Sequence, residues 1–256
     1  MRTDMRQVAD NTYLVHGSNT NWVIVTEGDA ATLVDTGYPG DRQRLLDSLR
    51  EVGSSPEAVA AVLITHAHND HLGSAEYLRR TYGTPVHLHE AEVPHARREF
   101  LHQVSVGQVL RNGWRPGVLP WVVHALRVGG TAHVPVTVPE AFPVTGALDL
   151  PGRPVPVHTP GHTKGHAVFH LPDSGVVISG DALVSGHPTS RIRGPQLLPD
   201  MFHHERAQAL ASLATLERLD ADVMLPGHGP VHHGPVRLAA QRAREHALQV
   251  RRAAPV

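Results

Sequence analysis

Three histidines and an aspartate fall within six consecutive positions of the stretch LITHAHNDHLGS, residues 63–74. Imidazole and carboxylate groups are the nitrogen and oxygen ligands by which proteins bind divalent ions such as zinc, iron and manganese. Four ligands from six residues cannot all converge on one tetrahedral ion without strain, so the segment indicates two adjacent ions. The four residues are His66, His68, Asp70 and His71.

Further candidate ligands follow apolar segments later in the chain. His162 lies in the glycine-flanked segment HTPGHTKGH, Asp181 follows the apolar run VVISG, and His228 stands between two glycines in VMLPGHGP. Loops at the rim of a rigid sheet are a common place for functional groups. Together the seven residues could supply two ions with about four or five ligands each, once a shared water is counted.

The elements that must position these ligands alternate between strands and helices in the first half of the chain. The apolar run AVAAVLIT, residues 58–65, is typical of a strand buried on both faces. Since alternate residues of a strand share one side, we expect His66 and His68 to point the same way at its end. Strands are predicted at 12–17, 21–28, 30–37, 58–65 and 85–90, and helices at 41–53 and 74–83.

From about Glu90 to Val138 the pattern loosens into two helical segments, 93–114 and 119–130, which proline and glycine interrupt. This insertion is either a lid packed over the site or a pair of connecting helices. Beyond it the pattern predicts strands at 136–144, 146–150, 153–161, 166–172, 175–181 and 221–229, and helices at 204–220 and 235–252. We therefore expect one α/β domain over residues 1–256, with two sheets face to face and helices outside.

Composition excludes several classes of protein. The formal net charge of -1 argues against a nucleic-acid partner, and the absence of cysteine excludes disulfides, thiolate zinc sites and cysteine nucleophiles. No apolar run approaches the roughly 20 residues that span a bilayer, and residues 1–17 lack the apolar core of a signal peptide. We expect a cytoplasmic protein that acts on a small molecule and has no membrane partner; homo-oligomerisation stays open.

The order H-x-H-x-D-H, then separate His, Asp and His motifs, resembles the metallo-β-lactamase superfamily from the strand LVDTG to LPGHG. The resemblance implies a four-layer αβ/βα sandwich with two divalent metals at one sheet rim, most often zinc, with iron or manganese as alternatives. It implies that one metal is held by His66, His68 and His162, and the other by Asp70, His71 and His228. Asp181 would bridge them, and Asp35 and His166 would support ligands by hydrogen bonds.

Such a pair of ions supplies a bridging hydroxide that attacks a carbonyl or phosphoryl centre, with Asp70 and Asp181 as the catalytic carboxylates and Asp70 handling the proton. The resemblance also helps to decide among the substrate classes known in the superfamily, because each class has features that can be sought in the sequence. True β-lactamases of the superfamily commonly lack the bridging aspartate. A nuclease would carry a basic exosite, and glyoxalase II a helical domain after the last ligand, where this chain has only residues 229–256.

Lactonases of the superfamily carry a tyrosine soon after the bridging aspartate, where DALVSGHPTS offers Ser185 and His187. We expect hydrolysis of an ester, lactone or thioester, with phosphodiesterase, β-lactamase or iron-dependent persulfide dioxygenase activity as the alternatives. Candidate substrate contacts are His187 and two tryptophans of the insertion, Trp114 and Trp121. Lys164, the only lysine, is either a partner for a substrate carboxylate or a solvated residue at the rim.

Overall fold

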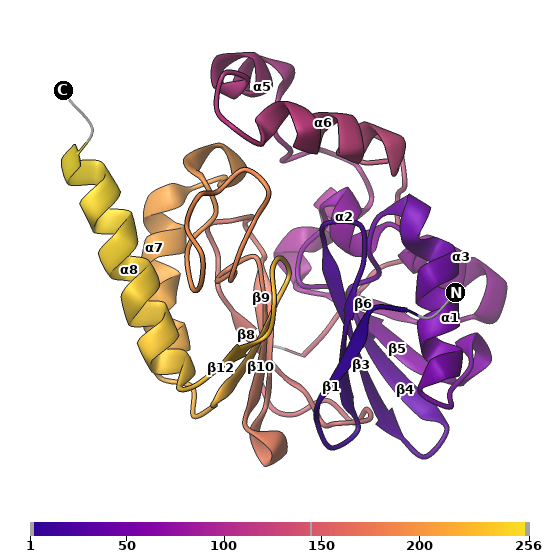
Figure 1. The fold of residues 1–256 in the computed structure, drawn as a ribbon. Helices are drawn as coiled ribbons and strands as arrows, with labels where there is room; N and C mark the ends of the chain where they lie inside the picture. The colour runs from indigo at the N-terminus through magenta and orange to yellow at the C-terminus, as the bar shows by residue number, and fades with distance from the viewer. Residues whose placement is uncertain (1–2, 144, 254–256) are drawn as a thin grey trace.

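The computed structural model describes residues 3–143 and 145–253 and contains two β-sheets packed face to face, with helices on their outer faces (Figure 1). One sheet has the strand order β1-β2-β3-β4-β5-β6-β7 and the other the order β12-β11-β10-β9-β8. The sequence prediction of an αβ/βα sandwich is confirmed.

The first sheet begins as an antiparallel meander from β1 to β4 and continues with parallel pairing from β4 to β7. The interior strand β3 reads NWVIVTE and is buried along all but its last residue, as expected for β-branched and aromatic residues in a sheet interior. The strands are β1 (Met5–Ala9), β2 (Thr12–His16), β3 (Asn21–Glu27), β4 (Ala30–Val34), β5 (Val59–Leu63), β6 (Val86–Leu88) and β7 (Glu140–Ala141).

The second sheet is antiparallel except where β10 pairs with β11 in parallel. The ends of these two parallel strands lead to Asp181 and His228, so the pairing brings both side chains to one rim. The strands are β8 (Val155–His158), β9 (Ala167–Leu171), β10 (Val176–Gly180), β11 (Val223–Pro226) and β12 (His232–His233).

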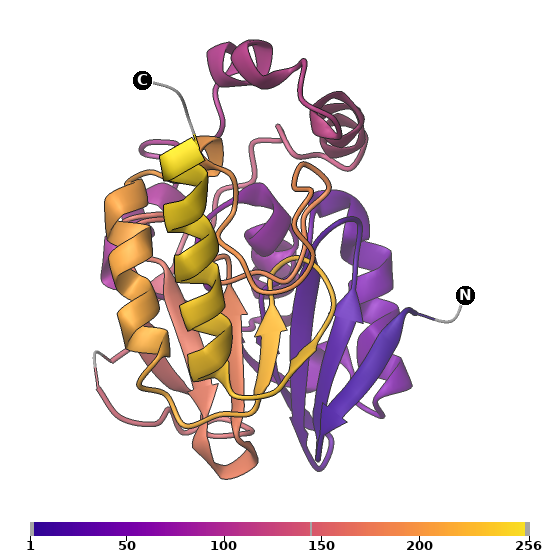
Figure 2. The same ribbon diagram turned by 60° about the vertical axis from the view of Figure 1, so that its left-hand side comes forward.

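Helices cover the outer faces of both sheets, α1 and α3 on the first and α7 and α8 on the second (Figures 1 and 2). Each buries an apolar stripe at helical spacing, as α1 does with Leu45, Leu46 and Leu49. The helices are α1 (Arg42–Glu51), α2 (Asn69–Leu72), α3 (Ala75–Tyr82), α4 (Val93–Ala96), α5 (Val106–Asn112), α6 (Val118–Arg127), α7 (Arg206–Leu216) and α8 (Val236–Ala253). Short 3-10 turns lie at η1 (Pro39–Asp41), η2 (Pro56–Ala58), η3 (Glu90–Glu92), η4 (Pro172–Ser174) and η5 (Asp200–Phe202).

The space between the sheets is filled by apolar side chains from both of them, which hold the two ligand-bearing rims in a fixed relation. Burial of such side chains is the main favourable term in folding, at about 25 cal/mol per Å² of apolar surface. The cluster includes Leu14, Val25, Leu63, Phe169, Ile178 and Leu225.

The insertion differs from the prediction in its first half. The helix expected over 93–114 is interrupted, because Arg98 adopts a left-handed backbone with φ of 63°. A new helix, α5, begins after Ser105, whose hydroxyl accepts from the Gln108 N–H in a capping box. Helices α5 and α6 project above the sandwich (Figure 1).

One predicted strand is shortened, one is absent, and two strands are present that were not predicted. The strand expected over 136–144 is reduced to the two residues of β7, because Pro139 and Pro143 lack the N–H that a ladder needs; residue 144 lies outside the described residues. Residues 146–150 form no strand. Strands β1 and β12, which the sequence did not predict, are short edge strands without a distinct apolar pattern.

Candidate metal centre

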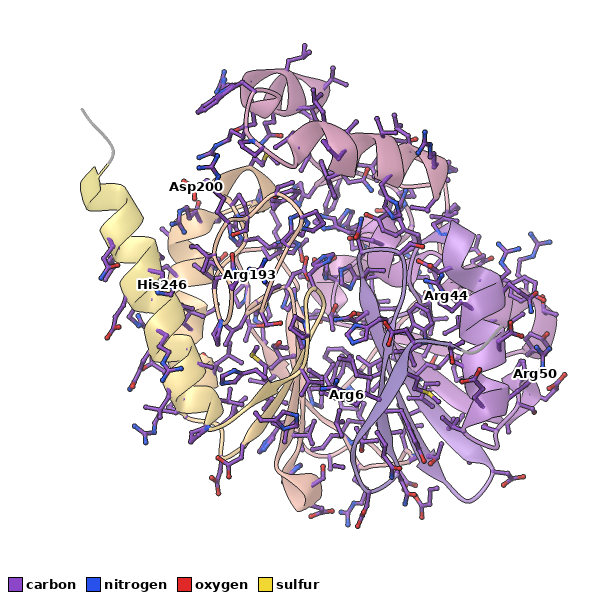
Figure 3. The ribbon with its side chains drawn as sticks, viewed as in Figure 1. Arg6, Arg44, Arg50, Arg193, Asp200 and His246 are labelled. Carbon is purple, nitrogen blue, oxygen red and sulfur yellow. The ribbon has the colours of Figure 1, made fainter. Side chains whose placement is uncertain are left out.

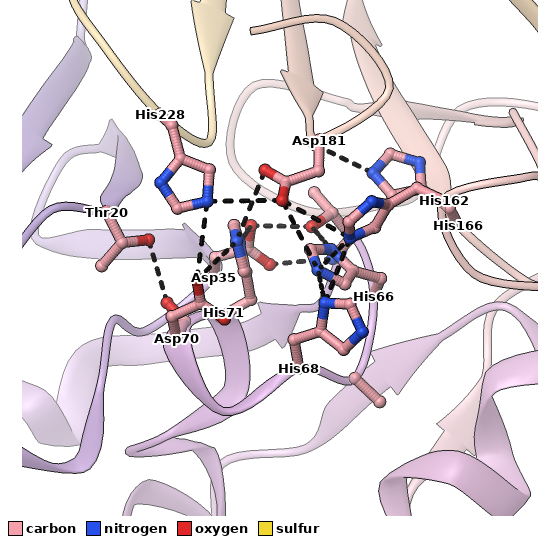
Figure 4. Close-up of polar contacts among 12 residues, drawn as sticks. Thr20, Asp35, His66, His68, Asp70, His71, His162, His166, Asp181 and His228 are labelled. Atoms are coloured by element: carbon pink, nitrogen blue, oxygen red, sulfur yellow. Dashed lines mark hydrogen bonds and ion pairs between the residues drawn. The ribbon is translucent and has the colours of Figure 1, made fainter. Parts of the chain in front are cut away.

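Seven predicted ligands from both halves of the chain converge at one rim of the sandwich (Figure 4). Strand β5 ends at Leu63, so His66 and His68 lie in the loop beyond it rather than at the strand end. The two side chains still converge, but the conformation of the loop directs them. The prediction that strand alternation would do so is wrong. The next two ligands, Asp70 and His71, lie on the short helix α2.

Three imidazole nitrogens form the first group of ligands. His66 Nε2 lies 2.9 Å from His68 Nδ1, and His162 Nε2 lies 3.2 Å from the former and 3.1 Å from the latter. Ligands about 2.1 Å from a tetrahedral zinc ion stand a little over 3 Å apart. The spacing therefore suits one cation held by three histidines.

The second group combines Asp70, His71 and His228. Asp70 Oδ2 lies 3.8 Å from His71 Nε2 and 3.5 Å from His228 Nε2. These separations suit a second cation beside the first.

Asp181 lies between the two groups. Its Oδ2 is 3.4 Å from His162 Nε2 and 3.3 Å from His228 Nε2, while its Oδ1 is 3.5 Å from His71 Nε2. The carboxylate thus faces both groups, which is the place that a bridging ligand takes.

Besides His162 Nδ1, two buried atoms of the predicted ligands have no hydrogen-bond partner among the described residues, and both face other ligands and fit a metal. They are His71 Nε2 and Asp181 Oδ1. Buried polar atoms are nearly always paired, because leaving one unpaired costs about 1–3 kcal/mol. A cation with nitrogen and oxygen ligands would satisfy both atoms, so the residues present fit divalent metal binding.

Hydrogen bonds from outside the two groups fix the imidazole rings. His71 Nδ1 donates to Asp35 Oδ2 at 2.8 Å, and Asp35 also accepts from the backbone N–H and the hydroxyl of Thr65. Asp35 holds a left-handed backbone with φ of 63°, a conformation that costs free energy outside glycine. The strained position is therefore stabilised by three hydrogen bonds that also orient a ligand.

His166 supports the bridging carboxylate rather than a metal. Its Nε2 accepts a hydrogen bond from the backbone N–H of Asp181 at 3.0 Å, and its Nδ1 donates to the Thr159 hydroxyl at 2.9 Å. Two further rings are set by main-chain acceptors: His68 Nε2 donates to the His102 carbonyl, and His228 Nδ1 donates to that of Asn19. In each case the other ring nitrogen is left for the site.

Burial and neighbouring carboxylates shift the pKa values of the histidines in opposite directions. Burial lowers the pKa of His66 and His162 well below the usual value, and lowers that of His68 to about 4, so these rings are neutral and can ligate. Although burial alone would lower it, the carboxylates led by Asp181 raise the pKa of His71 to about 10. A metal must displace that proton, so binding at the second group depends on pH.

Glycine is required at one position of the rim because of close packing. A Cβ at Gly227 would lie 2.3 Å from Asp181 Oδ1 and 2.8 Å from His71 Cε1. Gly227, which precedes His228, therefore leaves the space that the bridging carboxylate occupies.

A cavity of about 330 Å³ opens onto both ligand groups. Its walls come from the insertion and from the loop after Asp181, and of the predicted substrate contacts it includes Trp121 and His187. Trp114 is 80% exposed and lies outside these walls, so the structure does not bring it to the site. Lys164 is also exposed, outside the walls, with its Nζ 5.8 Å from the centre of the Phe100 ring.

Sequence reasoning missed two sets of residues. Tyr38, directly after the D-T-G turn, is buried and lines the cavity, and the walls also include Val122, Leu198 and Phe202.

Glu92 and Arg98 hydrogen-bond to the backbone of Ala67, the residue between His66 and His68. The Ala67 N–H donates to Glu92 at 2.9 Å, and the Ala67 carbonyl accepts from Arg98 at 2.8 Å. A buried Glu in the segment LHEAEVPH carries no motif by which the sequence alone would reveal it.

Comparisons with known proteins agree with this geometry. The metallo-beta-lactamase superfamily model matches residues 16–228. The chain is 23% identical over 214 residues to the probable metallo-hydrolase YflN of Bacillus subtilis, covering 80% of this chain and 77% of the relative. It is 28% identical over 213 residues to the probable metallo-hydrolase YqgX of the same organism, covering 82% and 85% of the two chains.

Solved structures show the same fold. A metallo-beta-lactamase family protein from Thermus thermophilus matches with a TM-score of 0.65 and 26% identity over 94% of this chain and 80% of that one. A B3 metallo-beta-lactamase with an active-site glutamic acid matches with a TM-score of 0.66, covering 96% and 89%, but at 19% identity it shows the fold alone. Together, the superfamily match over most of the chain and the ligands gathered at the rim identify an enzyme of the metal-dependent hydrolase type. The chain belongs to the metallo-β-lactamase superfamily.

Proposed function

We propose that the protein is a binuclear metallo-hydrolase that cleaves the acyl bond of an ester, lactone or thioester in a small molecule with an apolar acyl group. The observation that carries the proposal is the position of Asp181, which faces both ligand groups at one end of a mainly apolar cavity. A bridging carboxylate and an apolar wall are what a two-metal acyl hydrolase needs.

The first ion would be held by His66, His68 and His162, the second by Asp70, His71 and His228, with Asp181 shared. Zinc suits a set of five imidazoles and two carboxylates best, with iron or manganese as alternatives. When bound, two such ions supply Lewis-acid polarisation of the scissile carbonyl and a water of lowered pKa.

Three side chains of the chain itself are placed to complete the reaction. Asp70 lines the cavity and is partly exposed, so it can take the proton of the attacking water and return it to the leaving group. Burial, reinforced by the charge of Asp70, raises the pKa of Tyr38, so its hydroxyl stays protonated and can donate to a substrate oxygen.

His187 offers a second donor in the cavity. Its Nδ1 accepts from the Thr189 N–H at 3.2 Å, which leaves the ring proton on Nε2. The ring lies 5.0 Å from His228, centre to centre, and 4.9 Å from Phe202. A neutral imidazole held in this way can donate one hydrogen bond to the developing oxyanion.

The residues that line the cavity favour an acyl substrate over a phosphodiester. No arginine or lysine is among the lining residues of the described chain, whereas a phosphodiester would need a cation to pair with its charge. The apolar lining, which includes Val104, Val109, Trp121, Val122, Leu198 and Phe202, would instead hold an acyl chain.

The test is a pH-stat hydrolysis panel on zinc-loaded protein, with Asp181→Asn as the blank. The panel contains an acyl-homoserine lactone, S-lactoylglutathione, a simple thioester, a β-lactam and an activated phosphodiester. Turnover of the lactone or a thioester, lost in the blank, is the expected result. Turnover confined to the β-lactam or the phosphodiester would contradict the proposal. The proposal would also be contradicted if no substrate of the panel were hydrolysed and the purified protein contained iron and consumed oxygen. That result would favour a persulfide dioxygenase.

A further inference from the structure

The insertion carries an outward apolar surface that the metal centre does not explain. Seven of the ten large apolar side chains that are exposed in the described chain lie between residues 101 and 126, which we name the α5–α6 arm. Monomeric proteins rarely expose so many neighbouring apolar groups without a partner. Five of the seven lie outside the cavity walls, namely Leu101, Leu110, Trp114, Leu119 and Val123, whereas Val106 and Leu126 are exposed but also line the cavity.

These side chains form stripes with helical spacing. Leu110 and Trp114 stand four residues apart at the end of α5 and just beyond it, and they are 77% and 80% exposed. Leu119 and Val123 stand four residues apart on α6 and form a second outward pair, whereas Leu126 on the same helix lines the cavity. The arm is therefore apolar on its outer side as well as on the side that lines the cavity.

The charges of the arm all have one sign. Between Glu99 and Glu140 the sequence has no acidic residue, although the whole chain has a formal net charge of -1. Three arginines of the arm, Arg111, Arg115 and Arg127, are exposed. Exposed aromatic and aliphatic residues with arginine and no acid are typical of segments that lie in the interface of an anionic bilayer.

We propose that the α5–α6 arm docks the protein on the surface of a membrane that contains anionic phospholipid. Trp114, Leu110 and Leu119 would enter the headgroup region, and the three arginines would pair with lipid phosphates. No described helix is long and apolar enough to cross a bilayer, and docking at a surface requires none. The sequence prediction that no membrane is a partner rested on the lack of a spanning segment and of a signal-peptide core, and neither bears on docking at a surface.

A second copy of the chain is a less suitable occupant. A two-fold interface places the same patch on both sides, so arm against arm would bring six arginines together with no acid from either arm. Like charges opposed across an interface are unfavourable. An anionic lipid surface has the complementary charge.

The test is co-sedimentation of the full chain with phosphatidylcholine vesicles, with and without phosphatidylglycerol. We expect binding only when phosphatidylglycerol is present. The double variant Leu110→Glu, Leu119→Glu should lose binding, whereas Leu238→Glu on α8, a leucine that is exposed outside the arm, should retain it. Arg111→Gln should weaken binding about five-fold, which corresponds to about 1 kcal/mol. Arg50→Gln on α1, away from the arm (Figure 3), should not.

Trp114 provides a spectroscopic readout. Trp22 is buried and Trp121 faces the cavity, so a blue shift of tryptophan emission on adding anionic vesicles should come mainly from the exposed Trp114 and vanish in Trp114→Phe. Equal binding by the double variant, with its fold confirmed by circular dichroism, would overturn the proposal. So would a lack of any binding to anionic vesicles. Self-association that the double variant abolishes, without vesicle binding by the wild type, would assign the arm to a second copy instead.

Discussion

The Glu92 carboxylate accepts a hydrogen bond of 2.9 Å from the backbone N–H of Ala67, the residue between His66 and His68. Its other oxygen accepts from the Gly165 N–H, also at 2.9 Å, in the loop that carries His162. One buried side chain thus joins ligand-bearing loops from both sheets. Glu92 is a positioning residue, since it contacts the backbone of the loops and no metal-facing atom.

Replacing Glu92 with glutamine should loosen the first ligand group. An amide oxygen can accept one of the two backbone bonds, but its NH₂ then faces the other donor. We expect metal affinity to fall roughly 10–100-fold, as for other residues that orient ligands. Competition with a chelator would measure the loss, and Glu90→Gln, an exposed neighbour, is the matched control. Equal affinity in the two variants would contradict the role assigned to Glu92.

The same carboxylate should make stability depend on pH. Burial alone would raise its pKa, but hydrogen bonds led by that of His95 lower the pKa of Glu92 to about 2, from 4.5. A carboxylate whose folded pKa is depressed stabilises the fold above its unfolded pKa, and this contribution is lost as pH falls through the folded pKa. The shift corresponds to about 3 kcal/mol at neutral pH.

Urea unfolding of the metal-free protein from neutral pH to about pH 2 would measure this contribution. The difference in unfolding free energy between wild type and Glu92→Gln should be largest above about pH 5 and shrink toward pH 2. A difference that stays constant over that range would show that Glu92 is not ionised in the fold.

Asp35→Asn should weaken the second ligand group while preserving the turn. Asparagine tolerates the left-handed backbone at this position, but its amide group cannot accept from both His71 and Thr65 as the carboxylate does. We expect the ion held by His71 to be bound roughly 10–100-fold more weakly. Metal content after dialysis against limiting zinc tests this, with Asp47→Asn as control, since Asp47 is half-buried on α1 and pairs with Arg50 rather than with a ligand. Unchanged occupancy of both ions would refute it.

Gly227→Ala should displace the bridging carboxylate, because the added methyl group would lie 2.3 Å from Asp181 Oδ1. Gly186→Ala is a matched control, since its Cβ would meet nothing closer than 3.7 Å. We expect the first variant to lose the second ion and to unfold more easily by about 1–3 kcal/mol, as overpacked sites do. If both variants keep the same metal content, the packing argument at this rim fails.

Much of the candidate metal centre could be predicted from sequence because its ligands lie within short motifs in the segments that follow strands. Asp35 and His166 also belonged to such motifs. By contrast, Glu92 and Tyr38 act through tertiary contacts, Glu92 with Ala67 and Gly165, which are distant in sequence. Strand alternation gave the wrong reason for the convergence of His66 and His68, because hydrogen bonds from Glu92 and Arg98 shape the loop.

The predicted strand and helix boundaries were wrong where a left-handed residue, a helix cap or a proline interrupted a segment with a continuous apolar pattern. Arg98 and the Ser105 cap split one predicted helix, and prolines shortened β7. The exposed stripes of the α5–α6 arm have the same periodicity as core-facing stripes. Only the structure distinguishes the side that lines the cavity from the side that faces solvent.

The most direct test of the two-metal account is a titration of metal-free protein with zinc, followed by the rate of hydrolysis of a simple thioester. We predict that the rate keeps rising until two equivalents have been added and that Asp181→Asn shows no such rise. A rate that reaches its plateau at one equivalent, or that does not depend on zinc, would contradict the assignment of Asp181 as the ligand shared by two catalytic ions.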